Sequence, residues 1–293
     1  MMTDTKNVQV GFVGLGIMGQ SMAGHLLKAG HPLHLFNRTR SSAEALVARG
    51  AVWHETVGAM AAASDFVISM VGYPADVEAI YLGAGGIIGS ARGGTVLIDM
   101  TTSSPDLAKK IAAAAQQRGL LALDAPVSGG DIGAREARLS IMVGGDQLAF
   151  EKALPLLQLM GGNVVLQGGP GAGQHTKMCN QIVIASTMLG VCEGLAYAQR
   201  SGLDPQTVLQ SIGSGAASSF ALNNLGLRIL KNDFAPGFFI EHFVKDMGIA
   251  LSEARRMNLD LPGLTLASQL YQQLVTLGYA RNGTQALFKH YES

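Results

Sequence analysis

The 293-residue sequence lacks several features that would mark particular classes of protein. It has two cysteines, too few for a disulfide framework, so we expect a reducing, cytoplasmic compartment. Basic and acidic residues both number 21, without a basic run, which argues against nucleic acid or an anionic membrane surface as a partner. Residues 1–7 are polar, unlike a secretion signal. The longest apolar stretches fall short of the roughly 20 residues that a membrane span needs, so we expect no membrane association.

Charged residues are also scarce, at 14% against 48% hydrophobic residues. This composition is ample for a large core, and it suggests that another subunit covers part of the surface, as in a homodimer or homotetramer. The seven histidines show no metal-ligand spacing, so no metal site is expected. The length suggests two domains at roughly 150 residues each.

The first half of the sequence alternates short apolar runs with helical patterns, which is typical of an α/β fold with a doubly wound, Rossmann-like parallel sheet. Strands are expected at 8–13, 33–36, 65–71, 95–98, 120–124, 140–143 and 164–166, and helices at 18–28, 41–48, 75–82 and 105–118.

The pattern changes after the glycines and proline of residues 168–173. Residues 174–199 contain no proline and place apolar residues at helical spacing, which predicts one long interdomain helix. Shorter helices are expected at 205–212, 219–230, 243–257 and 262–277. The domains expected are therefore 1–170, which is α/β, and 171–293, which is all-α.

A glycine motif lies where the first expected strand meets the first expected helix. It reads Gly14-Leu15-Gly16-Ile17-Met18-Gly19. In this strand-turn-helix context the first glycine allows a tight turn, the second a close approach to a pyrophosphate, and the third close helix–strand packing. The helix start offers free N–H groups to the anion, so residues 1–170 are predicted to bind NAD(P).

The end of the second expected strand discriminates between the two nicotinamide cofactors. It reads Asn37-Arg38-Thr39-Arg40 and has no acidic residue of the kind that usually binds the ribose hydroxyls of NAD. Asn37 can still bond a hydroxyl, and Arg38, with Arg40 as a second candidate, could pair with a 2′-phosphate. We favour NADP over NAD, with solvated loop arginines as the alternative.

Five ordered blocks resemble the β-hydroxyacid dehydrogenase family, which includes enzymes of the 3-hydroxyisobutyrate dehydrogenase and tartronate semialdehyde reductase types. The resemblance covers nearly the whole chain. The blocks are Gly11-Phe12-Val13-Gly14-Leu15-Gly16-Ile17-Met18-Gly19, Asp99-Met100-Thr101-Thr102, Asp124-Ala125-Pro126-Val127-Ser128-Gly129-Gly130, Gly171 to Gln181, and Phe243-Val244-Lys245-Asp246-Met247.

The resemblance implies a role for Lys177 as the catalytic lysine that exchanges a proton with the substrate hydroxyl. Burial would lower its pKa toward neutrality, and such proton transfer typically contributes about 10²- to 10⁴-fold. Ser128, Gly129 and Gly130 resemble the loop that binds the substrate carboxylate. Thr102 resembles a position near both nicotinamide and substrate.

Three further assignments follow from the resemblance. Gln181 lies one helical turn after Lys177, where many members carry an asparagine that binds the substrate hydroxyl. Lys245 resembles a second lysine that reaches the cofactor, with a surface lysine paired to Asp246 or Glu253 as the alternative. Met70 and Val71 are expected beside the cofactor.

The function expected is hydride transfer between NAD(P) and a small 3-hydroxy acid or its semialdehyde. Two alternatives remain open. An imine reductase shares this architecture but usually replaces the lysine, and a non-catalytic dinucleotide-binding sensor would have kept only the fold.

Overall fold

The computed structural model describes residues 8–292, and the chain divides into two compact units, Met1–Lys177 and Met178–Ser293. The division falls inside the long helix α9 (Ala172–Arg200), whereas the sequence pattern placed it in the glycine-rich segment just before this helix. The polar segment 1–7, on which the secretion argument rested, lies outside the described residues.

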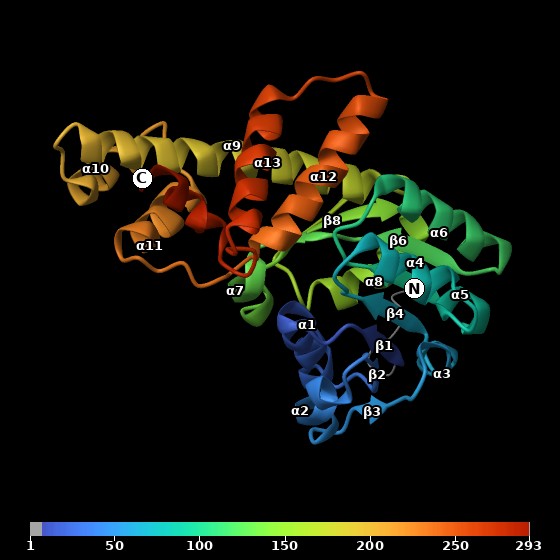
Figure 1. Cartoon of the computed structure of the whole chain (residues 1–293). Coiled ribbons are helices and arrows are strands. Elements are labelled where there is room, and N and C mark those ends of the chain that lie inside the picture. Colours follow the sequence, from blue (N-terminus) through green and yellow to red (C-terminus); the bar gives the residue numbers. More distant parts are fainter. Residues whose placement is uncertain (1–7, 293) are drawn as a thin grey trace. The chain divides into compact units, whose positions relative to one another are not determined.

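Unit 1 (Met1–Lys177) contains a nine-stranded sheet within its described residues (Figure 1). The strand order is β3-β2-β1-β4-β5-β6-β8-β7, with β9 beside β8. The strands are β1 (Val10–Val13), β2 (Leu33–Phe36), β3 (Val52–Trp53), β4 (Phe66–Ser69), β5 (Val96–Asp99), β6 (Leu121–Asp124), β7 (Val127–Ser128), β8 (Ser140–Gly145) and β9 (Asn163–Gly168).

The first six strands are parallel, as expected, and their carboxyl ends meet at one edge of the sheet. β1 pairs with both β2 and β4, so the chain changes direction across the sheet at β1, the switch point where such folds bind ligands. β8 runs antiparallel to β6 and β7, a reversal that the sequence pattern did not predict.

Helices cover both faces of this sheet and enclose two apolar cores. One core packs residues of α1 (Ile17–Lys28), α2 (Glu44–Val47), α7 (Gly130–Arg135) and α8 (Gln147–Leu157). The other packs residues of α3 (Val57–Ala62), α4 (Pro74–Leu82), α5 (Ile87–Ser90) and α6 (Pro105–Gln117). The predicted α/β fold with a doubly wound sheet is confirmed.

Several short elements were missing from the prediction. β3 and β7 have two residues each, too few to show an alternating pattern, and α7 includes two glycines, which disfavour helices. The predicted helix 41–48 is in fact a 3-10 turn, η2 (Arg40–Ala43), followed by α2.

Unit 2 (Met178–Ser293) is helical, as predicted, within its described residues. Its helices after α9 are α10 (Pro205–Ile212), the π-helical η3 (Ala221–Gly226), α11 (Leu227–Leu230), α12 (Ile240–Arg256), α13 (Pro262–Thr276) and the 3-10 helix η4 (Thr284–Tyr291). The predicted helix 219–230 is therefore partly π-helical.

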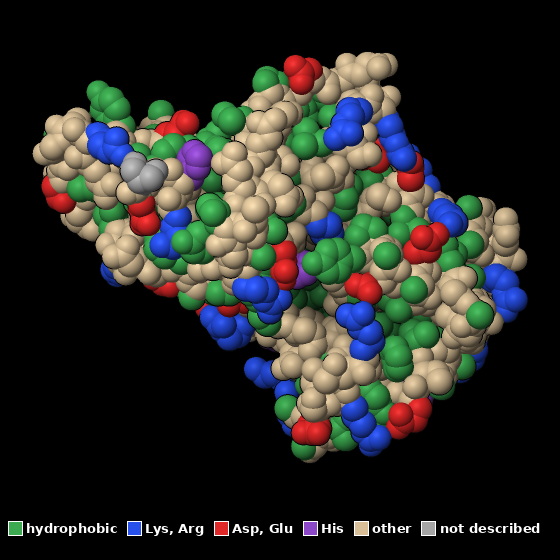
Figure 2. Space-filling model, in the orientation of Figure 1, with side chains coloured by type: hydrophobic (Ala, Val, Ile, Leu, Met, Phe, Trp, Pro, Cys, Tyr) green, Lys and Arg blue, Asp and Glu red, His purple; other side chains and the backbone are tan. Residues whose placement is uncertain are grey.

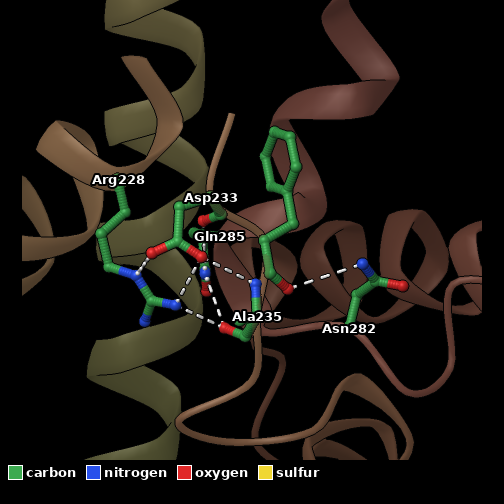
Figure 3. Close-up of polar contacts among 6 residues, drawn as sticks. Arg228, Asp233, Ala235, Asn282 and Gln285 are labelled. Carbon is green, nitrogen blue, oxygen red and sulfur yellow. Dashed lines mark hydrogen bonds and ion pairs between the residues drawn. The ribbon is translucent and has the colours of Figure 1, made fainter. Parts of the chain in front are cut away.

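A polar cluster fixes the segment between α11 and α12 to the start of η4 (Figure 3). Arg228 donates from Nε to Asp233 at 2.8 Å and from Nη2 to the Ala235 carbonyl at 2.6 Å. Gln285 Nε2 donates to the carbonyls of Asp233 and Ala235 at 3.0 and 3.1 Å. These bonds replace the regular backbone pairing that this irregular segment lacks.

Among the described residues one helix, α9, is long and apolar enough to cross a membrane by length and composition alone. The core helix of a soluble protein passes the same test, so this is weak evidence for a membrane span. On the face of the described chain drawn in Figure 2, basic and acidic side chains are interspersed.

Candidate functional site

The glycine motif forms the turn between β1 and α1 at the carboxyl edge of the sheet. Gly14 has φ +91°, and a Cβ there would lie 2.2 Å from the Met70 carbonyl oxygen. A Cβ on Gly19 would lie 1.9 Å from the Gly14 carbonyl oxygen. Both positions therefore require glycine, one for its conformation and the other for the contact between turn and helix.

Gly16 differs from its two neighbours in the motif. It is exposed, and no atom of the described residues lies within 4 Å of where its Cβ would be, apart from its chain neighbours. Within the described chain, no side chain caps the α1 N-terminus here, and the first turn of α1 has no acidic residue. This open, uncapped helix start fits the pyrophosphate of a dinucleotide, with Leu15, Ile17 and Met18 contributing the surrounding backbone.

The residues after β2 support the glycine turn. Asn37 Oδ1 accepts a 3.0 Å hydrogen bond from Leu15 N–H, and its Nδ2 donates to the Thr39 carbonyl at 2.9 Å. Arg38 is 86% exposed, and its Nη1 lies 3.4 Å from Asp76 Oδ1 at the start of α4. An exposed pair of this kind is worth about 0–1 kcal/mol, so Arg38 can exchange Asp76 for another anion.

Asp99 organises the loops that follow β4 and β5. Its Oδ1 accepts hydrogen bonds from Ser69 Oγ (2.8 Å) and from Thr101 N–H (3.1 Å), and Thr101 Oγ1 accepts from Val71 N–H (3.0 Å). Burial raises the pKa of Asp99 to about 6, with nearby Asp124 adding to the rise and the hydrogen bonds from Thr101 and Ser69 opposing it. This network holds Met70 and Val71 beside the loop that contains Thr102.

The Ser128-Gly129-Gly130 segment connects β7 to α7. Ser128 and Gly130 are half-buried and Gly129 is exposed. Gly129 has φ +132° and Gly130 φ +62°, so both adopt conformations that favour glycine. A residue with a side chain would adopt either conformation only with strain, so the segment requires both glycines.

Lys177 lies in the second turn of α9 and is 6% exposed. The start of α9 is held by Asp124, the last residue of β6. Asp124 Oδ1 accepts from Gly171 N–H and Oδ2 from Gln174 N–H, both at 2.8 Å. The fully buried side chain of Gln174 accepts from Ser103 N–H at 2.9 Å and donates to the Thr101 carbonyl at 2.7 Å.

In unit 2, the Gln181 side chain is engaged at both ends. Its Nε2 donates to Asp246 Oδ2 at 2.6 Å, and its Oε1 accepts from Asn180 Nδ2 at 2.8 Å. Lys245 Nζ lies 3.0 Å from Asp246 Oδ1. The pairing of Lys245 with Asp246 was the alternative that the sequence left open, although Lys245 is mostly buried rather than a surface lysine.

Unit 1 thus brings together most of the residues proposed from the sequence. Four neighbouring strands end at one edge of the sheet, and each is followed by predicted site residues. The glycine turn follows β1, residues 37–39 follow β2, residues 70–71 follow β4 and Thr102 follows β5. The sequence analysis assigned no role to Asp99, Asp124 or Gln174, whose side chains bond to these loops and to the start of α9, although all three stand inside the quoted motif blocks. Within residues 8–292, no group of three or more His, Cys, Asp or Glu residues could hold a metal ion.

Two family models match the chain. Residues 9–169 match the NAD binding domain of 6-phosphogluconate dehydrogenase, and residues 171–291 match the NAD-binding domain of NADP-dependent 3-hydroxyisobutyrate dehydrogenase. Together with the glycine turn, these matches define a dinucleotide-dependent oxidoreductase. The chain belongs to the β-hydroxyacid dehydrogenase family, as its sequence motifs predicted.

Known relatives cover the chain almost completely. It is 55% identical over 280 residues to an uncharacterised oxidoreductase of Bacillus subtilis, covering 96% of this chain and 97% of that protein. It is 40% identical over 285 residues to 2-hydroxy-3-oxopropionate reductase of Escherichia coli, covering 97% of each. The chain is therefore an NAD(P)-dependent hydroxyacid dehydrogenase, as expected.

Solved structures of similar enzymes also match the chain over nearly its whole length. The 3-hydroxyisobutyrate dehydrogenase of Mycobacterium tuberculosis, solved with L-serine, has a TM-score of 0.90 and 30% identity, covering 98% of this chain and 99% of that one. Psf3 in complex with NADP+ and 2-OPP has a TM-score of 0.87 and 26% identity, covering 96% and 99%. An imine reductase from Pseudomonas sp. has a TM-score of 0.63 and 21% identity, covering 97% of this chain and 99% of that one. This likeness shows a shared fold alone.

Proposed function

We propose that this enzyme interconverts a small 3-hydroxy acid and its semialdehyde, with Lys177 as the general acid and base. When bound, the nicotinamide supplies or accepts the hydride. In the reduction, Lys177 Nζ donates a proton to the carbonyl oxygen that becomes the hydroxyl. In the oxidation, it takes that proton back.

The placement of Lys177 carries this proposal. Lys177 is buried, and it lies one helical turn after Gln174, whose side chain bonds to both chain neighbours of Thr102. Proton transfer and hydride transfer act on the same carbonyl group, so the proton donor and the threonine beside the nicotinamide must be held in a fixed arrangement. Thr102 is the residue that the family resemblance places near nicotinamide and substrate.

We propose that the segment Ser128-Gly129-Gly130 binds the carboxylate of the substrate. The Ser128 hydroxyl and the glycine amides supply neutral donors to this anion. A fixed carboxylate would orient the carbonyl carbon for hydride transfer, which is how proximity lowers a barrier. The expected partner is therefore a small-molecule carboxylate.

We propose NADP as the preferred cofactor. The residues after β2 include no acid to bind the ribose hydroxyls, and Arg38 is exposed and only weakly paired. Psf3, 26% identical, was solved with NADP+. Asn37 and Thr39 would contribute by shaping the turn around this ribose, since the Asn37 amide already bonds Leu15 and Thr39.

A homodimer or homotetramer remains the expected assembly. The long helix α9 exposes apolar side chains such as Val183 and Tyr197, at 65% and 75%. Surface of this kind is typical of subunit contacts. Sedimentation velocity over a range of protein concentrations would measure the assembly directly.

The test of the proposed function is a steady-state screen with NADPH and NADH. The panel contains tartronate and succinic semialdehydes, 3-hydroxy acids for the reverse direction, and cyclic imines. Turnover of a semialdehyde or 3-hydroxy acid well above that of any imine supports the proposal. Preferred turnover of imines would favour the imine reductase, and cofactor binding without turnover would favour the sensor.

A further inference from the structure

We propose that Gln174 is a positioning residue for Lys177, and that Asp124 anchors it. Together they tie the catalytic helix to the loop that contains Thr102. This inference rests on the proposed function of Lys177. Neither residue touches the reacting groups in the mechanism proposed above.

Asp124 fixes where α9 begins. Its two carboxylate oxygens accept hydrogen bonds from the N–H groups of Gly171 and Gln174. Gly171 directly precedes α9, and Gln174 is the third residue of the helix. The partial positive charge of a helix start favours a carboxylate at this place. Burial raises the pKa of Asp124, and the backbone hydrogen bonds from Gly171, Gln174 and Gly173 oppose that rise. Because Asp124 is the last residue of β6, this contact fixes the start of α9 relative to the sheet.

The packing around this cap leaves little room for adjustment. A Cβ on Gly173 would lie 2.4 Å from the Met142 carbonyl oxygen and 2.5 Å from that of Asp124. A Cβ on Gly144 would lie 2.6 Å from both Asp124 Oδ1 and Gly173 N. The first turn of α9 therefore lies directly against β6 and β8, with glycine required on both sides.

The Gln174 side chain connects the start of α9 to the loop that contains Thr102. Its Oε1 accepts from Ser103 N–H and its Nε2 donates to the Thr101 carbonyl, so one buried amide holds the residues before and after Thr102. Gln174 and Lys177 are three residues apart on one helix and lie on the same side of it. Gln174 therefore couples the first turns of α9, which carry Lys177, to the loop that contains Thr102, through a side chain whose two polar groups are both engaged.

The experiment compares Gln174→Ala with Gln199→Ala, a control that removes an exposed glutamine from the other end of the same helix. We expect Gln174→Ala to lower kcat by about 10²-fold, the cost of a misplacement of about 1 Å, while the Kd for NADPH changes little. Amide hydrogen exchange at Ser103 should accelerate in Gln174→Ala and not in Gln199→Ala. Unchanged kcat, or a Ser103 amide that stays protected, would overturn the proposal.

A double variant tests whether Gln174 acts through Lys177. In the Lys177→Ala background, Gln174→Ala should leave the residual rate unchanged within about twofold, because the group that it positions is gone. Multiplicative losses would contradict a positioning role. A normal rate in Lys177→Ala would overturn the proposed function itself, whereas a normal rate in Gln174→Ala beside an impaired Lys177→Ala would overturn only the role of Gln174.

Gln174→Glu provides an isosteric second variant in case the alanine variant does not fold. As a neutral acid it can still accept from Ser103 and donate to the Thr101 carbonyl, but when ionised it has only acceptors. Its kcat relative to the wild-type enzyme should therefore fall as the pH rises and recover at low pH. A ratio that does not depend on pH would contradict the proposed hydrogen bonds.

Discussion

The side-chain nitrogen of Gln181 donates a 2.6 Å hydrogen bond to Oδ2 of Asp246, a carboxylate that is 1% exposed. Family resemblance assigned Gln181 to the substrate hydroxyl, one turn after Lys177. The structure shows that its amide already joins Asn180 on one side and Asp246 on the other. This bond links α9 to α12 within unit 2.

Replacing Gln181 by leucine should therefore destabilise the fold. Gln181→Leu keeps the side-chain volume but removes a donor to a buried carboxylate, which typically costs about 1.5–3 kcal/mol of unfolding free energy. Urea denaturation measures it, with Gln199→Leu as an exposed control on the same helix. Unchanged stability together with a raised KM for substrate would show instead that the main role of Gln181 is at the substrate.

The glycine turn predicts a difference between two alanine substitutions. Gly16→Ala places a methyl group in open space at the helix start, so we expect a folded protein with dinucleotide affinity weaker by about tenfold, which is about 1.4 kcal/mol. Gly24→Ala, later in α1, is the control and should bind normally. Fluorescence titration with NADPH measures both, and equal affinities would remove Gly16 from the pyrophosphate site.

Arg38 is expected to discriminate between the cofactors. Arg38→Ala should raise the KM for NADPH far more than that for NADH, because only NADPH carries the 2′-phosphate that a guanidinium can bind. Its present partner Asp76 is a weak competitor, since the pair is exposed. Arg49→Ala, another exposed arginine of unit 1, is the control. Equal changes for both cofactors would exclude Arg38 from the phosphate role.

Asp99 makes the stability of the fold depend on pH. Burial raises its folded-state pKa from 3.8 to about 6, so the folded protein holds a proton that the unfolded chain releases. The contribution of Asp99 to the unfolding free energy is therefore complete below pH 4 and falls by about 3 kcal/mol as the pH rises to 6 and above.

Asp99→Asn keeps an oxygen acceptor but cannot ionise, so this fall should be absent. We expect the variant to gain stability relative to the wild-type protein between pH 4 and pH 7, as measured by chemical denaturation. Asp260→Asn, at an exposed site, is the control. Parallel pH profiles for Asp99→Asn and the wild-type protein would contradict a raised pKa.

Local sequence patterns were sufficient for the main elements of the fold. The strand at 33–36 and the helix at 205–212 were predicted with their observed bounds, because apolar runs and proline or glycine mark their ends. The antiparallel β8 and the two-residue strands were not predictable, because strand direction and short pairings depend on distant partners.

The site shows the same limit. The glycine motif and the lysine block are local patterns and could be recognised directly. The contacts of Gln174 with Thr101 and Ser103 span more than 70 positions in the chain, and those of Asp124 with α9 about 50, so no local spacing reveals them. The only available signal was that both residues stand inside blocks that already carried other assignments.

The most direct test of the account is the turnover of Lys177 variants. Lys177→Ala should lower kcat by at least about 10²-fold with little change in the Kd for NADPH, and Lys177→Arg should fare no better, since an arginine keeps the charge but does not release its proton. Lys152→Ala, an exposed lysine of α8, should behave as the wild-type enzyme. A Lys177→Ala enzyme that reduces its semialdehyde at the wild-type rate would contradict the central claim.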